Sequence, residues 1–194
     1  MSFRANTTSI DDATDSLAII SLGSNLALTR GSLHLSPESI LRNALTELQA
    51  LATTPLKISS LYRTAPLDCP PGSSDFFNAI ALMRVRQELA ATDFLKQLHA
   101  LEVKFGRLRT NTLNQPRPLD LDLICFGRLQ INAPNLILPH PRALERRFVM
   151  DPLAEIAPEL LLPGQQLNVI TLTQRLRSNR GSAQRVERLQ WEKP

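Results

Sequence analysis

The chain has 194 residues, of which 43% are apolar and 21% charged, with 7 Gly, 14 Pro and 2 Cys. These proportions are typical of a globular domain and exclude collagen-like, linker-like and disulfide-framework chains. No apolar run approaches the roughly 20 residues that a membrane span needs, and aspartates lie where a signal peptide would be apolar. We therefore expect a cytoplasmic protein that does not bind membranes.

The net charge of +4 is concentrated near the C-terminus. Residues 175–194 carry six Lys or Arg against two Glu, so residues 1–174 hold 16 charges of each sign and balance. A Ser-, Gln- and Arg-rich segment of this kind buries little apolar surface, and the charge gives little support to a nucleic-acid partner. We expect a flexible extension at 1–16, a single domain at 17–174 and a basic C-terminal tail at 175–194.

The first predicted elements are a strand and a helix. The apolar run 17–24 predicts a buried strand that ends at a Gly-Ser-Asn corner. Ser36 and Pro37 predict the N-cap and first turn of a helix, and apolar residues recur at helical spacing as far as Leu51. Two further strands are predicted at 57–63 and 78–86, with a Pro-rich loop between them.

Helical spacing returns after Thr92, a predicted N-cap, and Gly106 predicts a left-handed helix end. Strands are then predicted at 118–127 and 128–132, followed by a loop with helical turns at 140–160. The order fits neither a strict βαβ rhythm nor an all-β rhythm. It favours the α+β class, with a mostly antiparallel sheet and helices on its faces.

Asp120 and Asp122 are the most informative pair in the chain. In a strand, residues i and i+2 point to the same face, about 6.6 Å apart, so both carboxylates share one face. Such carboxylates repel each other unless a cation lies nearby, and oxygen ligands without His or Cys favour Mg²⁺ over zinc. Two solvated residues on an exposed strand, or the acidic pair of a glycosyltransferase, are alternatives at this point.

Side chains that could donate hydrogen bonds to phosphate flank the pair on both sides: Arg107, Arg109, Arg117, His140, Arg142, Arg146 and Arg147. Arginine forks match phosphate oxygens, although a surface ion-pair network is the alternative for any one of them. The sequence contains no Walker, Rossmann, protein-kinase, nucleophile-elbow or zinc-ligand motif. Any catalysis would therefore rest on metal and arginine.

Six segments, in order over about residues 17–163, carry a resemblance to a known family: SLGSN, SSLYRTAPL, DFFNAI, PRPLDLDLICFG, LPHPR and ERRFVMDPLAEIAP. They resemble the signatures of 6-hydroxymethyl-7,8-dihydropterin pyrophosphokinase, an enzyme of folate biosynthesis. The resemblance implies a ferredoxin-like α+β sandwich and transfer of a diphosphoryl group from ATP to the hydroxymethyl oxygen of the reduced pterin, releasing AMP. We also expect a monomer.

The resemblance further implies a set of site residues. Two magnesium ions would be held by Asp120 and Asp122, with Arg107, Arg117 and Asp122 as catalytic residues. ATP, the co-substrate, would be contacted by His99, Glu102, Arg109, Leu123, His140 and Arg146. The pterin would be contacted by Thr64, Pro66, Leu67, Phe76, Asn78 and Phe148. Aromatic faces and a side-chain amide suit a flat polar ring, although core packing and turn chemistry are the ordinary roles of such residues.

Three features depart from the family pattern. Asp68 stands where a glycine is common, the loop from Thr110 to Gln115 lacks the usual basic and aromatic residues, and extra residues follow Asn25. Asn25 itself could lie beside the pterin or simply form a turn. The alternative functions are a degenerate paralogue that binds a nucleotide or RNA, and another metal-dependent transferase that uses Asp-x-Asp.

Overall fold

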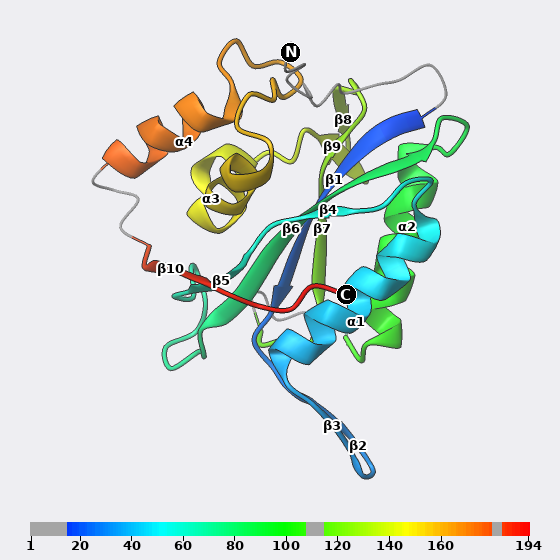
Figure 1. The fold of residues 1–194 in the computed structure, drawn as a ribbon, viewed down its shortest axis with the longest axis vertical. Coiled ribbons are helices and arrows are strands. Elements are labelled where there is room, and N and C mark those ends of the chain that lie inside the picture. Colours follow the sequence, from blue (N-terminus) through cyan, green and yellow to red (C-terminus); the bar gives the residue numbers. More distant parts are fainter. Residues whose placement is uncertain (1–14, 108–114, 180–183) are drawn as a thin grey trace, which may run out of the picture.

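The computed structural model describes residues 15–107, 115–179 and 184–194, and its centre is an antiparallel sheet (Figure 1). The strands of this sheet are β1 (Asp15–Ser24), β4 (Lys57–Ile58), β5 (Leu61–Thr64), β6 (Phe76–Arg86), β7 (Asp120–Phe126) and β10 (Val186–Leu189). They follow the order β10-β5-β6-β1-β7, and β4 pairs with β6. Every pairing between these strands is antiparallel, as predicted.

Four α-helices occur in the described ranges: α1 (Pro37–Leu51), α2 (Ala91–Lys104), α3 (Arg147–Ile156) and α4 (Val169–Ser178). The order β1-α1-β5-β6-α2-β7, with β1 and β6 central, is the βαββαβ arrangement of a ferredoxin-like fold. A short 3₁₀ turn, η1 (Ala143–Glu145), precedes α3. The α+β prediction is confirmed.

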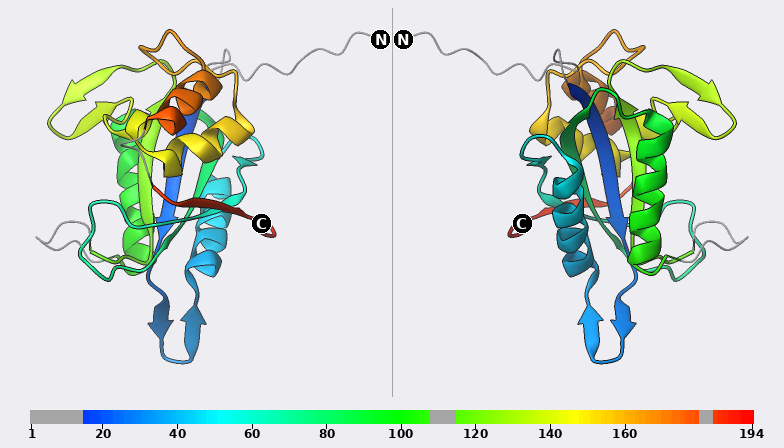
Figure 2. Two further views of the ribbon diagram at one scale, coloured as in Figure 1. Left: turned by 90° about the vertical axis from the view of Figure 1, so that its left-hand side faces the viewer. Right: turned by 90° about the vertical axis from the view of Figure 1, so that its right-hand side faces the viewer.

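The helices cover both faces of the sheet, and this makes two cores (Figure 2). Ile20 of β1 packs with Leu45 of α1 and Phe94 of α2, whereas its neighbour Ile19 packs with Met150 of α3 on the opposite face. Adjacent strand residues therefore serve different cores, because successive side chains alternate between faces.

On the α3 face, each central strand changes from apolar to polar along its length. In β1, Leu17 and Ile19 belong to the core under α3, whereas Ser21 and Gly23, two and four residues further along the same face, line a pocket. The α3–α4 layer thus covers only part of this face. The uncovered part carries the candidate site.

The predicted ends of α1 are confirmed, because Ser36 is its N-cap and the Ser36 hydroxyl accepts a hydrogen bond from Ser39 N at 3.3 Å. The single strand predicted at 57–63 is wrong in detail, since two residues without strand structure separate β4 from β5. At the break the Ser59 hydroxyl donates to Ser60 O at 2.7 Å and accepts from Ile80 N at 2.9 Å. Ser59 N still donates to Ile80 O at 3.0 Å, so the Ser59 hydroxyl adds to the backbone contact with β6 at this point.

The predicted cap of α2 is also wrong, because the N-cap is Ala90 and makes no side-chain hydrogen bond, while Thr92 lies inside the helix. Gly106 does take the expected left-handed conformation, with φ 84°. The segment 140–160 contains a continuous helix, α3, where only turns were expected. Its apolar face packs on the sheet, and this outweighs the unfavourable Pro152 inside it.

Two small hairpins complete the described strands: β2 (Leu28–Arg30) with β3 (Leu33–Leu35), and β8 (Ile131–Ala133) with β9 (Leu136–Leu138). Of these strands only β8 was predicted, and its predicted range of 128–132 lies too early in the chain. The expected boundary between residues 174 and 175 lies inside α4, and β10 lies within the segment interpreted as a tail. No helix of the described ranges is long and apolar enough to cross a membrane.

Candidate active site

Asp120 and Asp122 lie on β7 and face the uncovered part of the sheet, while Leu121 is buried on the other side. In the register of β1 against β7, Asp122 pairs with Ser21 and Asp120 pairs with Gly23. Both aspartates line two different pockets, one on each side of β7. The predicted acidic face therefore forms a wall that two binding sites share.

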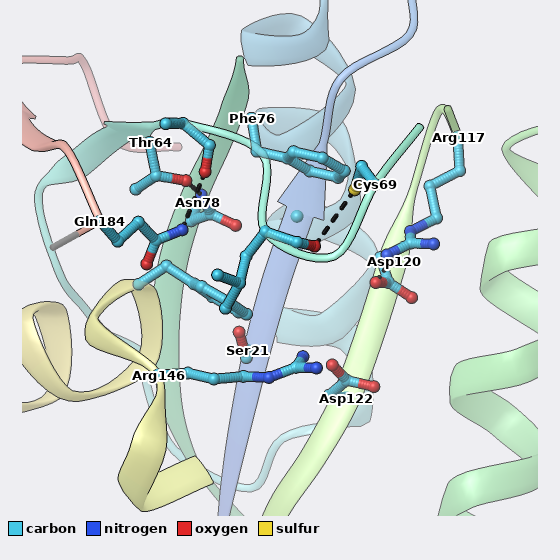
Figure 3. A pocket seen from close by; sticks show the side chains of 14 residues that line it. Ser21, Thr64, Cys69, Phe76, Asn78, Arg117, Asp120, Asp122, Arg146 and Gln184 are labelled. Carbon is cyan, nitrogen blue, oxygen red and sulfur yellow. Dashed lines mark hydrogen bonds and ion pairs between the residues drawn. The ribbon is translucent and has the colours of Figure 1, made fainter. Parts of the chain in front are cut away.

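The first pocket contains most of the residues that were predicted to contact a pterin (Figure 3). Its lining includes Thr64, Leu67, Phe76, Asn78 and Phe148 from that prediction. Pro66 is not part of the lining, and lies half-buried between two residues that are. In Figure 3, Thr64 and Asn78 lie at the opposite wall from Asp120 and Asp122.

Asn78 is held in place by two neighbours. Its Nδ2 donates to Thr64 Oγ1 at 2.8 Å, and both side chains are buried. A Cβ added to Gly23 would lie 3.2 Å from Asn78 Oδ1, so only glycine leaves this oxygen uncrowded. Asn78 therefore presents an oriented carbonyl oxygen beside the pocket.

The second pocket contains most of the residues predicted to contact ATP, with His99, Glu102, Leu123 and His140 among its lining. Arg107 also lines it, although it was predicted as a catalytic residue. Arg109 lies outside the described residues. The wall facing α2 includes Leu136 and Ile137 of β9, a strand that sequence analysis did not predict.

Arg146 lines the first pocket and not the second. Its guanidinium carbon is 5.2 Å from the centroid of the Phe148 ring, and its side chain extends toward Asp122 (Figure 3). Arg146 was predicted to contact ATP, and it lies in the first pocket with its side chain directed to Asp122, a residue that both pockets share. Arg147, by contrast, pairs with Asp151 at 2.9 Å and belongs to the support of α3.

Arg107 bridges two acidic residues, Glu102 and Asp120, through its Nη1. Glu102 is only 1% exposed, and its Oε1 also accepts a hydrogen bond from Leu121 N at 2.9 Å. Burial lowers the pKa of Arg107, but the charges of Asp120 and Glu102 outweigh it and the net shift is upward. Glu102 therefore positions both Arg107 and the start of β7.

Arg117 lies on the other side of Asp120, with its Nε 2.9 Å from Asp120 Oδ2. Its guanidinium carbon is 5.5 Å from the centroid of Phe76, which lines the first pocket. The Arg117 backbone is fixed by Asn25, whose Oδ1 accepts from Arg117 N at 2.8 Å. Asn25 is not part of either pocket lining, and its contact with Arg117 N is neither a place in the pterin pocket nor the local turn that its sequence suggested.

Two groups at this wall have altered pKa values. Burial, followed by the charge of Asp120, raises the pKa of Asp122 to about 6, although Arg146 and Arg117 oppose the shift. Burial, followed by the charges of Arg146 and Arg142, lowers the pKa of His140. The site therefore has a carboxylate that needs a cation and a histidine that is neutral at pH 7.

A family model for 7,8-dihydro-6-hydroxymethylpterin-pyrophosphokinase matches residues 19–158 of this chain. The chain belongs to this pyrophosphokinase family. Its match to the 2-amino-4-hydroxy-6-hydroxymethyldihydropteridine pyrophosphokinase of Pseudomonas aeruginosa is 38% identical over 144 residues, and covers 74% of this chain and 82% of that protein. The enzyme of the same name from Synechocystis is 34% identical over 160 residues, or 82% of this chain and 75% of that protein.

Longer proteins also match. The folic acid synthesis protein fol1 of Pneumocystis carinii is 32% identical, but this chain spans only 20% of it. The structure of Plasmodium falciparum wild-type HPPK-DHPS with pteroate has a TM-score of 0.60 at 12% identity, and covers 85% of this chain and 45% of that chain. At this identity the likeness shows the fold. The predictions of an ATP-dependent pterin pyrophosphokinase and of its fold are confirmed at the level of the family.

Several residues that line the two pockets were not named from the sequence: Ser21, Ala65, Cys69 and Gln184 in the first pocket, and Leu95, Pro134 and Asn135 in the second. Ser21 could have been found, since it interrupts the apolar alternation of β1 on the same face as Ile19. Gln184 had no such signal. It lies beyond the family match and reaches the pocket through the pairing of β10 with β5.

Proposed function

We propose that this pyrophosphokinase transfers a diphosphoryl group from ATP to the hydroxymethyl oxygen of 6-hydroxymethyl-7,8-dihydropterin on the wall formed by Asp120 and Asp122. The observation that carries this proposal is that the two carboxylates line both pockets. A transfer between two substrates needs the reacting atoms of both at one place. A shared acidic wall is such a place.

The first pocket suits the pterin. Phe76 and Phe148 offer aromatic faces, and Asn78 offers an oriented amide at the wall opposite Asp120 and Asp122. A ring whose polar edge meets Asn78 would extend its hydroxymethyl group toward the carboxylates. The attacking oxygen would then face the second pocket across β7.

The second pocket suits ATP. Its lining combines apolar side chains, such as Leu123 and Ile137, with His99, His140 and Arg107. Apolar groups can cover a purine, while the Arg107 guanidinium and the imidazole N–H groups can donate hydrogen bonds to phosphates. We assign Arg107, Arg117 and Arg146 to the phosphates, because all three guanidinium groups lie around Asp120 and Asp122.

Magnesium fits the donor set of this wall. Within the described ranges, no cluster of three or more potential metal ligands occurs, and Asp120 and Asp122 form only a pair. Mg²⁺ typically takes one or two carboxylates and completes its octahedral shell with water and substrate phosphate oxygens. We therefore assign Asp120 and Asp122 as ligands of magnesium that arrives with ATP, and two ions are our proposal for its number. Bound magnesium would neutralise charge on the phosphates.

The reaction then proceeds by positioning and charge stabilisation, without a covalent enzyme intermediate. The hydroxymethyl oxygen attacks the β-phosphorus, the bond from the β-phosphorus to the bridging α–β oxygen breaks, and AMP leaves. Asp122 orients the attacking hydroxyl, whose proton passes to solvent water as the new bond to the β-phosphorus forms. Arg107 and Arg117 stabilise the negative charge that moves onto the bridging oxygen.

The test is an incubation with ATP, Mg²⁺ and 6-hydroxymethyl-7,8-dihydropterin, followed by chromatographic separation of AMP from ADP. We expect AMP that depends on both the pterin and the metal, with EDTA and pterin-free reactions as controls. ADP as the only product would contradict diphosphoryl transfer. Formation of neither AMP nor ADP with all substrates present would favour the degenerate paralogue.

Variants test the acidic wall itself. We expect Asp120→Asn and Asp122→Asn each to reduce kcat/KM by at least about a hundredfold. Each change removes a negative charge that would bind the magnesium ions of the ATP phosphates. Asp93→Asn is the matched control, since Asp93 is exposed, forms an ion pair with Lys96 on α2 and lines neither of the two pockets. Near-normal AMP formation by both wall variants would overturn the assignment.

A further inference from the structure

Ser21 is the one side chain that β1 contributes to the first pocket. Strand β1, which the structure describes over its whole length, lies between β6 and β7 in the sheet. Of its residues, Ser21 and Gly23 line the pocket, and Gly23 has no side chain. The Ser21 hydroxyl is therefore the polar group that the central strand places between the proposed pterin wall and the acidic wall.

The strand register places Ser21 beside Asp122. The two residues are opposite each other in the antiparallel pair of β1 and β7. Side chains at such positions share one face, with Cβ atoms about 4.5–5.5 Å apart. On its other side Ser21 is opposite Ile80, which belongs to the apolar core under α3. The polar cross-strand neighbour of Ser21 is thus the proposed magnesium ligand.

The Ser21 hydroxyl is available to a ligand. The residue keeps 4% of its surface exposed and lines the first pocket, so a molecule in the cavity can reach it. No hydrogen bond joins the hydroxyl to any residue that the structure describes. Buried hydroxyl groups usually have at least one partner in a native complex, and they can both donate and accept. The open hydrogen bond therefore points to a group of the substrate.

Figure 3 shows Ser21 between the side of the pocket that carries Asn78 and the side that carries Asp122. In the proposed orientation the ring meets Asn78 with its polar edge, and the hydroxymethyl group extends across β1 toward the carboxylates. The hydroxymethyl oxygen would then lie over Ser21. This oxygen has two lone pairs, so one can accept a hydrogen bond while the other attacks the β-phosphorus.

We propose that the Ser21 hydroxyl donates a hydrogen bond to the hydroxymethyl oxygen of the pterin and holds that oxygen beside Asp122 for the attack. The inference rests on the proposed function, because it requires the pterin in the first pocket. Ser21 keeps its proton throughout, so its contribution is positioning. The same contact makes the pocket selective for pterins that carry a hydroxyl group at this position.

The experiment uses two ligands that differ by one hydroxyl group, 6-hydroxymethyl-7,8-dihydropterin and 6-methyl-7,8-dihydropterin. Their Kd values are measured by calorimetry on the full chain with Mg²⁺ and α,β-methylene-ATP, in which a carbon bridge replaces the oxygen of the bond that would break. The proteins are the wild type, Ser21→Ala and the control Ser16→Ala. Ser16 lies on the same strand and lines neither of the two site pockets.

We expect the wild type to bind the hydroxymethyl compound more tightly than the methyl compound. In Ser21→Ala this preference should fall about fivefold, the effect of one neutral hydrogen bond, while the Kd for the methyl compound stays within about twofold. Ser16→Ala should keep the preference of the wild type. An unchanged preference in Ser21→Ala would overturn the proposal. So would an equal loss of affinity for both ligands, because it would reduce Ser21 to a structural role.

Failure of the proposed function looks different. A wild-type chain that makes no pterin-dependent AMP and binds neither ligand would overturn both proposals together. An active wild type with an unchanged ligand preference in Ser21→Ala would overturn only the role of Ser21. Should Ser21→Ala fail to fold, Ser21→Cys gives the same decision with the same two ligands, because a thiol of similar shape is a weak donor.

Discussion

Asn25 and Arg117 hold each other by two hydrogen bonds between segments that are far apart in the sequence. Asn25 Oδ1 accepts from Arg117 N at 2.8 Å, and Arg117 O accepts from Asn25 N at 3.2 Å. The end of β1 is thereby joined to the segment that leads into β7. This corner therefore helps to fix the segment from which the Arg117 guanidinium reaches Asp120.

We therefore expect Asn25→Ala to act on catalysis through Arg117. The variant leaves a partly buried N–H without its acceptor, so the free energy of unfolding should fall by about 1–2 kcal/mol. The value of kcat/KM should fall about tenfold or more, because the guanidinium loses its fixed position. Asn132→Ala, at an exposed site in β8, is the control. Normal kinetics in Asn25→Ala would show that the corner is not needed.

Asp122 makes stability depend on pH in the metal-free protein. Its pKa of about 6 exceeds the value near 4 of an unfolded chain, so the folded state binds the proton more tightly. The folded protein consequently loses stability as the pH rises from about 4 to above 6. Asp122→Asn should be more stable than the wild type by roughly 1–3 kcal/mol at pH 8 with EDTA, and the difference should vanish near pH 4.

Urea unfolding at several pH values measures this effect, and Asp93→Asn, at an exposed position, should show none of it. Added Mg²⁺ should stabilise the wild type more at pH 8 than at pH 5, because protons and the metal compete for the same carboxylate. A wild type that matches Asp122→Asn at every pH would contradict the raised pKa.

Glu155 joins α3 to the sheet and produces the opposite pH dependence. Burial would raise the pKa of its carboxyl, but hydrogen bonds from Ser60 and Tyr62 and the charge of Arg188 lower it overall. A lowered pKa gives stability that is present above about pH 4.3 and is lost as the pH falls through the folded value. Glu155→Gln should cost about 1–3 kcal/mol at pH 7 and much less near pH 3.

Chemical denaturation across this range tests the Glu155 prediction. Glu187→Gln is its matched control, because Glu187 forms an exposed ion pair with Arg63 and its loss should change stability by at most about 0.5 kcal/mol. An equal cost for Glu155→Gln at pH 7 and pH 3 would rule out a contribution from the carboxylate charge.

Asp68 carries backbone strain that the family glycine would relieve. Its φ is 55°, and it is the only residue other than glycine with a positive φ in the described ranges. We expect Asp68→Gly to be more stable than Asp68→Ala by about 1 kcal/mol, since both remove the carboxylate but only glycine adopts this conformation freely. Thermal unfolding of the two variants measures the difference. Equal midpoints would show that the turn adapts to either side chain.

The elements that sequence analysis predicted well are those whose signals are local. The apolar run of β1 and the Ser36–Pro37 start of α1 need no distant partner. Strand β10 has only Val186 and Leu189 as apolar residues and is stabilised by β5, which is far away in the sequence. The sequence contains no sign of that pairing, so the segment resembled a solvated tail.

The same distinction applies to the site. The spacing of Asp120 and Asp122 on one strand predicts their common face directly. The position of Glu102 could not be predicted, because a glutamate on a helix is ordinarily solvated, and only tertiary packing brings it to Leu121 N. The positions of Asn25 and Gln184 depend on contacts of the same distant kind.

The pairing of β10 with β5 also bears on how far the chain can be shortened. A version that ends at residue 158, where the family match ends, would lose α4 and β10. The backbone N–H and C=O groups on the edge of β5 that faces β10 would then be unpaired, while the opposite edge would keep its pairing with β6. An open strand edge is a template for pairing with another chain. Such a truncated protein would be prone to self-association through β5, whereas in the full chain the charged strand β10 shields that edge from aggregation.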